Sequence, residues 1–140
     1  SNLPAPRRSA QGVDSGRLSM ILAVVERRVG FPLAKLDVFT LAVGGVKVLE
    51  PGADLAVALA VASAMQGRPV PPDLVACGEI GLGGELRQVA HTPRRLAEAA
   101  RLGFTRAIVP HSAPHDVGGI ELIRVGTLLE AMDRLDLFDI

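Results

Sequence analysis

The passage from Gly44 to Gln66 constrains the fold of this chain more than any other stretch. It reads GGVKVLEPGADLAVALAVASAMQ, so a strand end, a Pro-Gly turn and a long apolar segment follow without a break. From Ala53 onward, apolar residues surround nearly the whole circumference of the expected helix. A helix of that kind must be covered on more than one side. The passage therefore predicts a strand, a turn and a helix at the centre of a packed domain.

Hydrophobic periodicity and turn residues predict the remaining elements. Strand Asp37–Val43 precedes the central passage. A first helix begins at Asp14 or Ser15 and ends near Gly30, with one buried apolar stripe. The later elements are a strand at Leu74–Ile80, a GLGG turn at 81–84, a returning strand at Glu85–Val89, a helix from Thr92 to Leu102, strands at Arg106–Pro110 and Glu121–Val125, and a helix at Thr127–Leu135. This alternation predicts parallel βαβ units within an α/β or α+β domain.

Length and composition predict one domain. The 140 residues are 49% hydrophobic, enough for one core but not for two. The opening residues are rich in Pro, Arg and Ser, which predicts a linker or remnant at 1–13 and a folded domain at 14–140, with further sequence expected upstream. The formal net charge is zero, so any binding to nucleic acid must come from local basic patches.

The chain shows no targeting or membrane segment, so we expect a cytoplasmic protein. The first residues lack the apolar core of a signal peptide, and the most apolar run is shorter than the roughly 20 residues needed to cross a bilayer. The single cysteine, Cys77, excludes an internal disulfide and fits a reducing compartment.

Motifs for phosphate, metal or thiol chemistry are weak. GLGG at 81–84 lacks the third glycine of GxGxxG, because Leu86 stands there, and no GxxxxGK[ST] occurs. His111 and His115 are four residues apart, but the intervening Ser-Ala-Pro predicts a loop, with only Asp116 as a further ligand, so surface histidines are favoured. Cys77 lies among apolar strand residues and is expected to be an inert buried thiol. We expect no metal and no cofactor in this domain.

The two arginines Arg94 and Arg95 stand out, because cations in the first turn of a helix oppose its dipole. Phosphate contact, a salt bridge across a subunit boundary and an ordinary solvated face each explain them. No aromatic platform accompanies them, which argues against recognition of individual bases. Arg27 and Arg28 end the first helix, where cations suit the dipole.

Several segments together resemble one known family. They are LPAPRR from Leu3, AVVERR from Ala23, VGGVKVLEPGADLAVALAVAS from Val43, RPVPPDLVACGEIGLGGELRQV from Arg68 and RRLAEAARLGFTRAIVP from Arg94. In order and spacing they resemble the C-terminal domain of the bacterial DNA repair family RadA, also called Sms. The resemblance implies a fold similar to the Lon proteolytic domain, of the ribosomal protein S5 domain 2-like type, in the α+β class.

The Lon-like resemblance raises the possibility of a Ser-Lys protease dyad. In active Lon domains the serine precedes the long helix and the lysine precedes the later helix, which places Gly52 and Pro93 at the two positions. Glycine has no hydroxyl and proline has no amine, so covalent acyl transfer by that route is excluded. An unorthodox peptidase using Ser63 remains a third reading of this chain.

The resemblance also implies a function. RadA is a DNA-dependent ATPase and helicase in branch migration, and its Lon-like domain forms a hexameric ring that supports the motor and contributes to DNA contact. ATP, Mg and Zn would belong to upstream domains. The candidates for DNA or subunit contact are Arg27, Arg28, Lys47, Arg68, Arg94, Arg95 and Arg106. An assembly module that never touches DNA is the alternative.

Overall fold

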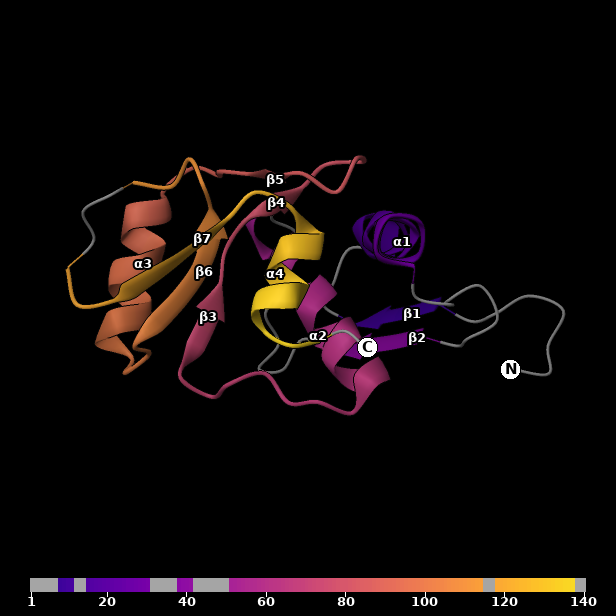
Figure 1. The fold of residues 1–140 in the computed structure, drawn as a ribbon, viewed down its shortest axis with the longest axis horizontal. Coiled ribbons are helices and arrows are strands. Elements are labelled where there is room, and N and C mark those ends of the chain that lie inside the picture. The colour runs from indigo at the N-terminus through magenta and orange to yellow at the C-terminus, as the bar shows by residue number, and fades with distance from the viewer. Residues whose placement is uncertain (1–7, 12–14, 31–37, 42–50, 115–117, 138–140) are drawn as a thin grey trace, which may run out of the picture.

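A three-stranded parallel sheet organises the second half of the chain (Figure 1). The computed structural model describes residues 8–11, 15–30, 38–41, 51–114 and 118–137. The sheet has the order β3-β6-β7, with β3 at Leu74–Ala76, β6 at Arg106–Pro110 and β7 at Glu121–Val125. The bounds predicted for β6 and β7 are confirmed.

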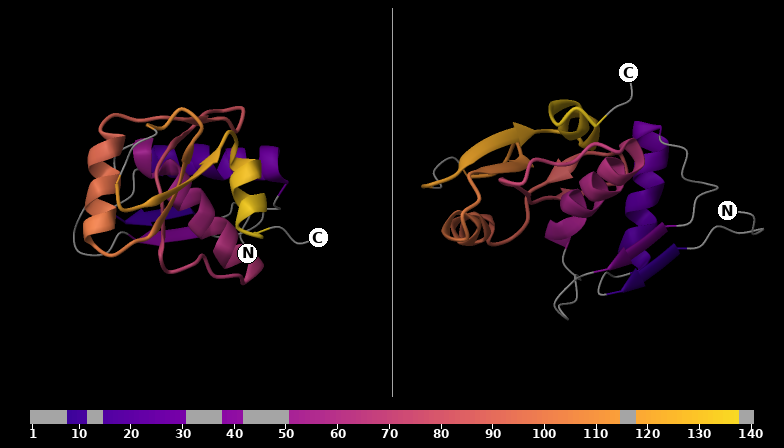
Figure 2. Two further views of the ribbon diagram at one scale, coloured as in Figure 1. Left: turned by 60° about the vertical axis from the view of Figure 1, so that its left-hand side comes forward. Right: turned by 90° about the horizontal axis from the view of Figure 1, so that it is seen from below.

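The two faces of this sheet pack against different helices. Along β6, Ala107 and Val109 belong to the core formed with α3 (Thr92–Arg101), whereas Ile108 belongs to the larger core formed with the other helices. This alternation is the period-two pattern of a strand buried on both faces. Figure 2 shows α3 on one side of the strands and the other helices on the opposite side.

The first helix forms as predicted and changes its winding near its end. Helix α1 spans Ser15–Val24 and continues as the π-helical segment η1, Val25–Val29. It ends at Gly30, whose φ of 90° is in the left-handed region that favours glycine. The predicted apolar stripe is buried: Leu18, Ile21, Leu22 and Val25.

A second, two-stranded parallel sheet flanks α1. Strand β1, Arg8–Gln11, pairs with β2, Val38–Leu41, and parallel pairing requires the crossover that α1 supplies. The linker predicted at 1–13 therefore overlaps a strand. Residues 8–11 have no strong strand pattern of their own, and their pairing with β2 gives them this structure. The predicted glycine turn at Gly44-Gly45 lies outside the described residues.

The central helix is confirmed, with a short 3-10 turn before it. Turn η2 spans Pro51–Ala53 and α2 spans Asp54–Gln66. Leu55, Ala58, Leu59 and Ala62 are buried in the larger core. None of the described helices is long and apolar enough to span a membrane.

The single strand predicted at Leu74–Ile80 is wrong, because the chain leaves the sheet at Cys77-Gly78. Cys77 N still donates to Ile108 O of β6 (3.1 Å). Gly78, by contrast, bonds to the start of α2: its N–H donates to Gly52 O (3.0 Å) and its carbonyl accepts from Leu55 N (3.1 Å). The chain then starts a new strand, β4, at Glu79–Ile80.

Strand β4 forms the predicted hairpin with β5, Leu86–Arg87. The GLGG turn needs its last glycine because Gly84 has a φ of 83°. The hairpin is joined to helix α4, Leu128–Arg134, through Leu86 N to Gly126 O (3.0 Å) and Leu128 N to Gly84 O (2.8 Å). The architecture combines parallel and antiparallel pairs with four α-helices among the described residues, which confirms the α+β class.

Candidate functional site

A cleft of about 320 Å³ lies between the start of α2, strand β3 and helix α3. One wall comes from Gly52, Ala53 and Ala56, and the opposite wall from α3 and Phe104. The remaining lining is mostly apolar: Val75, Ala76, Cys77, Leu96, Ala99 and Leu102, with Arg95 and Glu98 as the charged members. The predicted serine position thus lies in a real cleft.

Gly52, the first of the two predicted dyad positions, is buried in this cleft. A Cβ built on it would lie 3.0 Å from Val89 Cγ2 and 3.4 Å from Arg95 Nη1. An arginine side chain therefore occupies the space beside the position where a nucleophile would stand. Neither Gly52 nor its neighbour Ala53 offers a reactive side chain.

Pro93, the second dyad position, is exposed in the first turn of α3. The helix begins at Thr92 as predicted, and His91, with a φ of 63°, precedes it as the cap residue. Thr92 is buried and its hydroxyl donates to Val89 O (2.8 Å). The helix ends at Arg101, one residue before its predicted end at Leu102, and Leu102 is 62% exposed.

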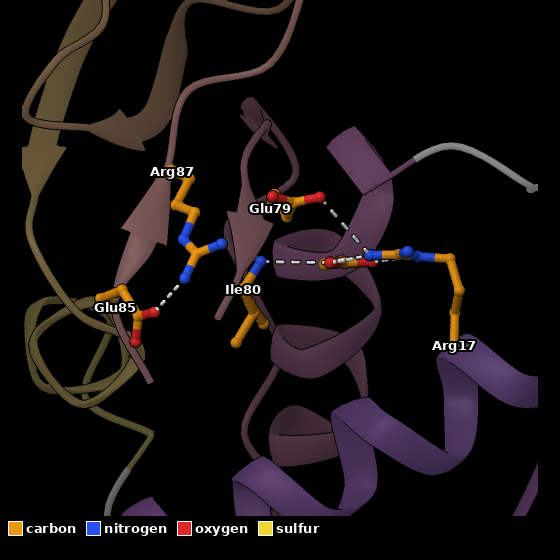
Figure 3. A network of polar contacts seen from close by, with 6 residues as sticks. Arg17, Glu79, Ile80, Glu85 and Arg87 are labelled. Atoms are coloured by element: carbon orange, nitrogen blue, oxygen red, sulfur yellow. Dashed lines mark hydrogen bonds and ion pairs between the residues drawn. The ribbon is translucent and has the colours of Figure 1, made fainter. Parts of the chain in front are cut away.

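The opposite side of the start of α2 holds a polar network that the sequence did not reveal (Figure 3). Asp54, only 2% exposed, accepts from Arg17 Nε (2.9 Å), from Arg17 Nη2 (2.5 Å) and from Ile80 N (3.1 Å). Arg17 also lies 4.0 Å from Glu79 Oε2. The network joins α1, α2 and β4. An acidic first residue suits the dipole of α2, but only the fold brings Arg17 to it.

Two of the predicted contact arginines are engaged within the fold. Arg106 forms a bidentate pair with Asp73, with Nε–Oδ2 and Nη2–Oδ1 distances of 2.8 Å each. Hydrogen bonds from Arg106 and then from Thr105 hold the pKa of Asp73 well below its ordinary value. Arg68 Nη1 donates to Asp136 O (3.0 Å) and lies 3.2 Å from Asp136 Oδ1.

Three of the other predicted cations, Arg27, Arg28 and Arg94, are exposed at the surface. Arg27 and Arg28 are exposed on η1, and Arg28 Nε donates to Leu82 O (3.4 Å) at the hairpin tip. Arg94 is exposed in the first turn of α3. Lys47 lies outside the described residues.

The two arginines at the start of α3 therefore have different surroundings. Arg95 is half-buried, lines the cleft and donates from Nε to Ala90 O (3.1 Å). Arg94, the preceding residue, is exposed and does not belong to the lining of the cleft. From the sequence alone, these two arginines could not be distinguished.

Of the residues considered for metal and thiol chemistry, the structure describes Cys77 and His111. Cys77 is buried at the cleft. His111 is exposed, with Nε2 3.8 Å from Glu130 Oε2, whereas His115 and Asp116 lie outside the described residues. Within the described part of the chain, no three His, Cys, Asp or Glu residues are grouped to hold a metal.

Comparison with known families gives a match over most of the chain. Residues 17–113 match the family model described as subunit ChlI of Mg-chelatase. The chain belongs to this family. The match covers the network around Asp54, the cleft and helix α3, so the site belongs to the shared part of the fold.

Curated relatives name a narrower group. The chain is 48% identical to the DNA repair protein RadA of Pseudomonas aeruginosa over 137 residues, and 47% identical to that of Synechocystis sp. over 129 residues. It is 45% identical to RadA of Escherichia coli over 141 residues. These matches cover 91 to 97% of this chain but only 26 to 30% of the relatives. The predicted resemblance to a RadA domain is confirmed.

Proposed function

We propose that this chain is a non-proteolytic Lon-like domain that supports assembly and DNA contact in a RadA-type DNA repair ATPase. The support is its identity to DNA repair proteins named RadA over more than nine-tenths of its length. The observation that carries the non-proteolytic part is the cleft itself. Gly52 lines it where a nucleophile would stand, and the Arg95 guanidinium lies beside it. Acyl transfer requires an activated nucleophile, which these side chains do not provide.

The alternative nucleophile, Ser63, lies outside the cleft. It lies in the last turn of α2, and its hydroxyl donates to Arg68 O (2.5 Å). It does not line the cleft, which is formed at the other end of the helix. These contacts do not favour the peptidase reading. Loss of a purified peptidase activity in a Ser63→Ala variant would favour it.

For DNA contact we favour the exposed cations over the paired ones. Arg27 and Arg94 are exposed, whereas Arg106 and Arg68 already bond carboxylates of the same chain. Guanidinium groups at the surface can pair with phosphate oxygens without first breaking an internal ion pair. A protomer with a formal net charge of zero can still bind DNA, because a ring of identical subunits adds weak contacts by multivalency.

The test is salt-dependent DNA binding by the chain and by an Arg27→Gln, Arg94→Gln double variant. Each lost phosphate contact should reduce the salt slope by about one and weaken binding to all sequences alike. Arg101→Gln is the matched control, because Arg101 is exposed but bonded to Glu98 within its own helix. If the double variant keeps both affinity and salt slope, these arginines do not contact DNA.

The second candidate, an assembly module without DNA contact, has its own support. Three large apolar side chains are exposed among the described residues: Leu82 at the hairpin tip (75%), Leu102 after α3 (62%) and Leu129 in α4 (47%). Apolar contacts between subunits would cover them. The mass of the chain in solution, measured for the parent and for Leu82→Ser, tests this reading. An oligomer that binds no DNA would favour it over the first proposal.

A further inference from the structure

The cleft combines an apolar lining with one inward-facing cation, and this combination is typical of a small-ligand site. Its volume of about 320 Å³ falls at the lower end of the range of roughly 300–1,000 Å³ seen for ligand pockets. Such pockets are mostly apolar, with a few polar groups that orient the ligand. Here the apolar surface comes from three separate elements: α2, β3 and α3.

Arg95 is the polar group placed to orient a ligand. Its guanidinium lies against Gly52, with Nη1 3.4 Å and Cζ 3.5 Å from the position that a Cβ on Gly52 would take. These are ordinary van der Waals distances, so Gly52 and the guanidinium are direct neighbours in this wall of the cleft. Guanidinium remains charged at any physiological pH and matches the planar geometry of a carboxylate.

The acidic residue in the lining does not cancel this preference. Glu98 accepts from Arg101 Nε (2.9 Å), and its second oxygen pairs with Arg101 Nη2. These hydrogen bonds from Arg101 lower the pKa of Glu98. The carboxylate of Glu98 therefore stays ionised and paired with Arg101. Arg101 is exposed and lies outside the lining, so the charge of Glu98 is paired with a residue that does not line the cleft.

We propose that this cleft binds a small aliphatic carboxylate, with the carboxylate on Arg95 and the apolar chain against α2, β3 and Phe104. The site goes beyond the proposed DNA role and does not depend on it. The volume favours a free short-chain acid over the end of a longer peptide.

The experiment is an NMR titration of the 140-residue chain with hexanoate, hexanol and hexylamine, which share an apolar chain and differ in their head group. We expect hexanoate to bind more tightly than hexanol, and hexylamine to bind least. Arg95→Gln should weaken hexanoate binding about tenfold and leave hexanol nearly unchanged, because a charge-assisted hydrogen bond is lost. Arg94→Gln, the exposed neighbour, should have no effect on either.

A second variant tests the apolar half of the site independently. Ala56 is exposed on α2 and lines the cleft, so Ala56→Phe should fill it without disturbing the core and should abolish binding of both hexanoate and hexanol. Equal affinity for hexanoate and hexanol, no binding of hexanoate, or binding that survives both Arg95→Gln and Ala56→Phe would overturn the proposal. Tighter binding of N-acetyl-Leu-Leu than of hexanoate would overturn the preference for a free acid.

Discussion

The two sides of the start of helix α2 differ in almost every physical property. On the side of α1, Asp54 is buried and fully bonded to Arg17 and to the backbone of Ile80 (Figure 3). On the side of α3, Gly52 and Ala56 face an apolar cleft. The first side is closed and joins three elements, whereas the second is open and has no reactive group from α2.

This difference separates the structural from the functional part of the region. A buried carboxylate that accepts three hydrogen bonds fixes the relative positions of the elements that donate them. The cleft has a mostly apolar lining, and it is the part of this region in which we propose a ligand site. Stability should therefore depend on the Asp54 side, and ligand binding on the Gly52 side.

The largest expected effect is on the Asp54 side. Asp54→Ala leaves the guanidinium of Arg17 without its main partner, and breaking such a pair destabilises a protein by about 3 kcal/mol. Arg17 is 25% exposed, so water relieves part of the loss and the lower end of the usual range applies. The free energy of unfolding from urea titration measures it.

Asp73→Ala is the matched control for that experiment. Asp73 also makes a bidentate pair with an arginine, but the side chains of Asp73 and Arg106 are 37% and 34% exposed. The control should lose less stability, because pairs in contact with water contribute little. Equal losses in the two variants would mean that burial does not set the strength of these pairs.

A smaller effect is expected on the Gly52 side. Gly52→Ser places a Cβ 3.0 Å from Val89 Cγ2, so the neighbour must shift, and such overpacking destabilises by about 1 kcal/mol or somewhat more. The new hydroxyl should not produce peptide hydrolysis, because Pro93 provides no amine to activate it. Urea titration and a fluorogenic peptide assay measure the two outcomes.

Ala53→Ser is the control, since it places a hydroxyl at the adjacent position of the same cleft. Hydrolysis by Gly52→Ser, absent from Ala53→Ser, would show that another base acts in the cleft. The non-proteolytic proposal would then rest on the missing serine alone.

The smallest effect concerns pH, and it sharpens the contrast between buried and exposed pairs. The pKa of Asp73 is lowered in the folded chain, by hydrogen bonds from Arg106 first and from Thr105 second. A lowered folded pKa means that ionised Asp73 stabilises the fold above its unfolded pKa of about 4, and that this contribution is lost as the pH falls below it.

The pH experiment compares the parent with Asp73→Ala by urea titration between neutral pH and about pH 3, below the unfolded pKa. The difference in unfolding free energy between them should be constant near neutral pH and should shrink as the pH falls. A difference that grows on acidification would have the wrong sign for a lowered pKa, and the pairing with Arg106 would not be its cause.

Local patterns predicted those elements whose surroundings are simple. Strands β6 and β7 have the predicted bounds, and the stripe from Leu18 to Val25 is buried as its spacing indicated. Two errors have one cause, which is long-range pairing. Strand β1 exists because β2 lies beside it, and the strand from Leu74 divides because Gly78 bonds to Gly52 and Leu55. Neither partner is near in sequence, so no local pattern could reveal these contacts.

The candidate site divides in the same way. The sequence determined that Gly52 has no hydroxyl and Pro93 no amine, the two groups that the predicted dyad would need, because side-chain chemistry does not depend on the fold. Only the tertiary structure decided that Arg95 faces the cleft while Arg94 faces solvent, and that Asp54 meets Arg17 across 37 residues. Hydrogen bonds and ion pairs act over a few ångströms, so the fold must bring distant residues together before they can form.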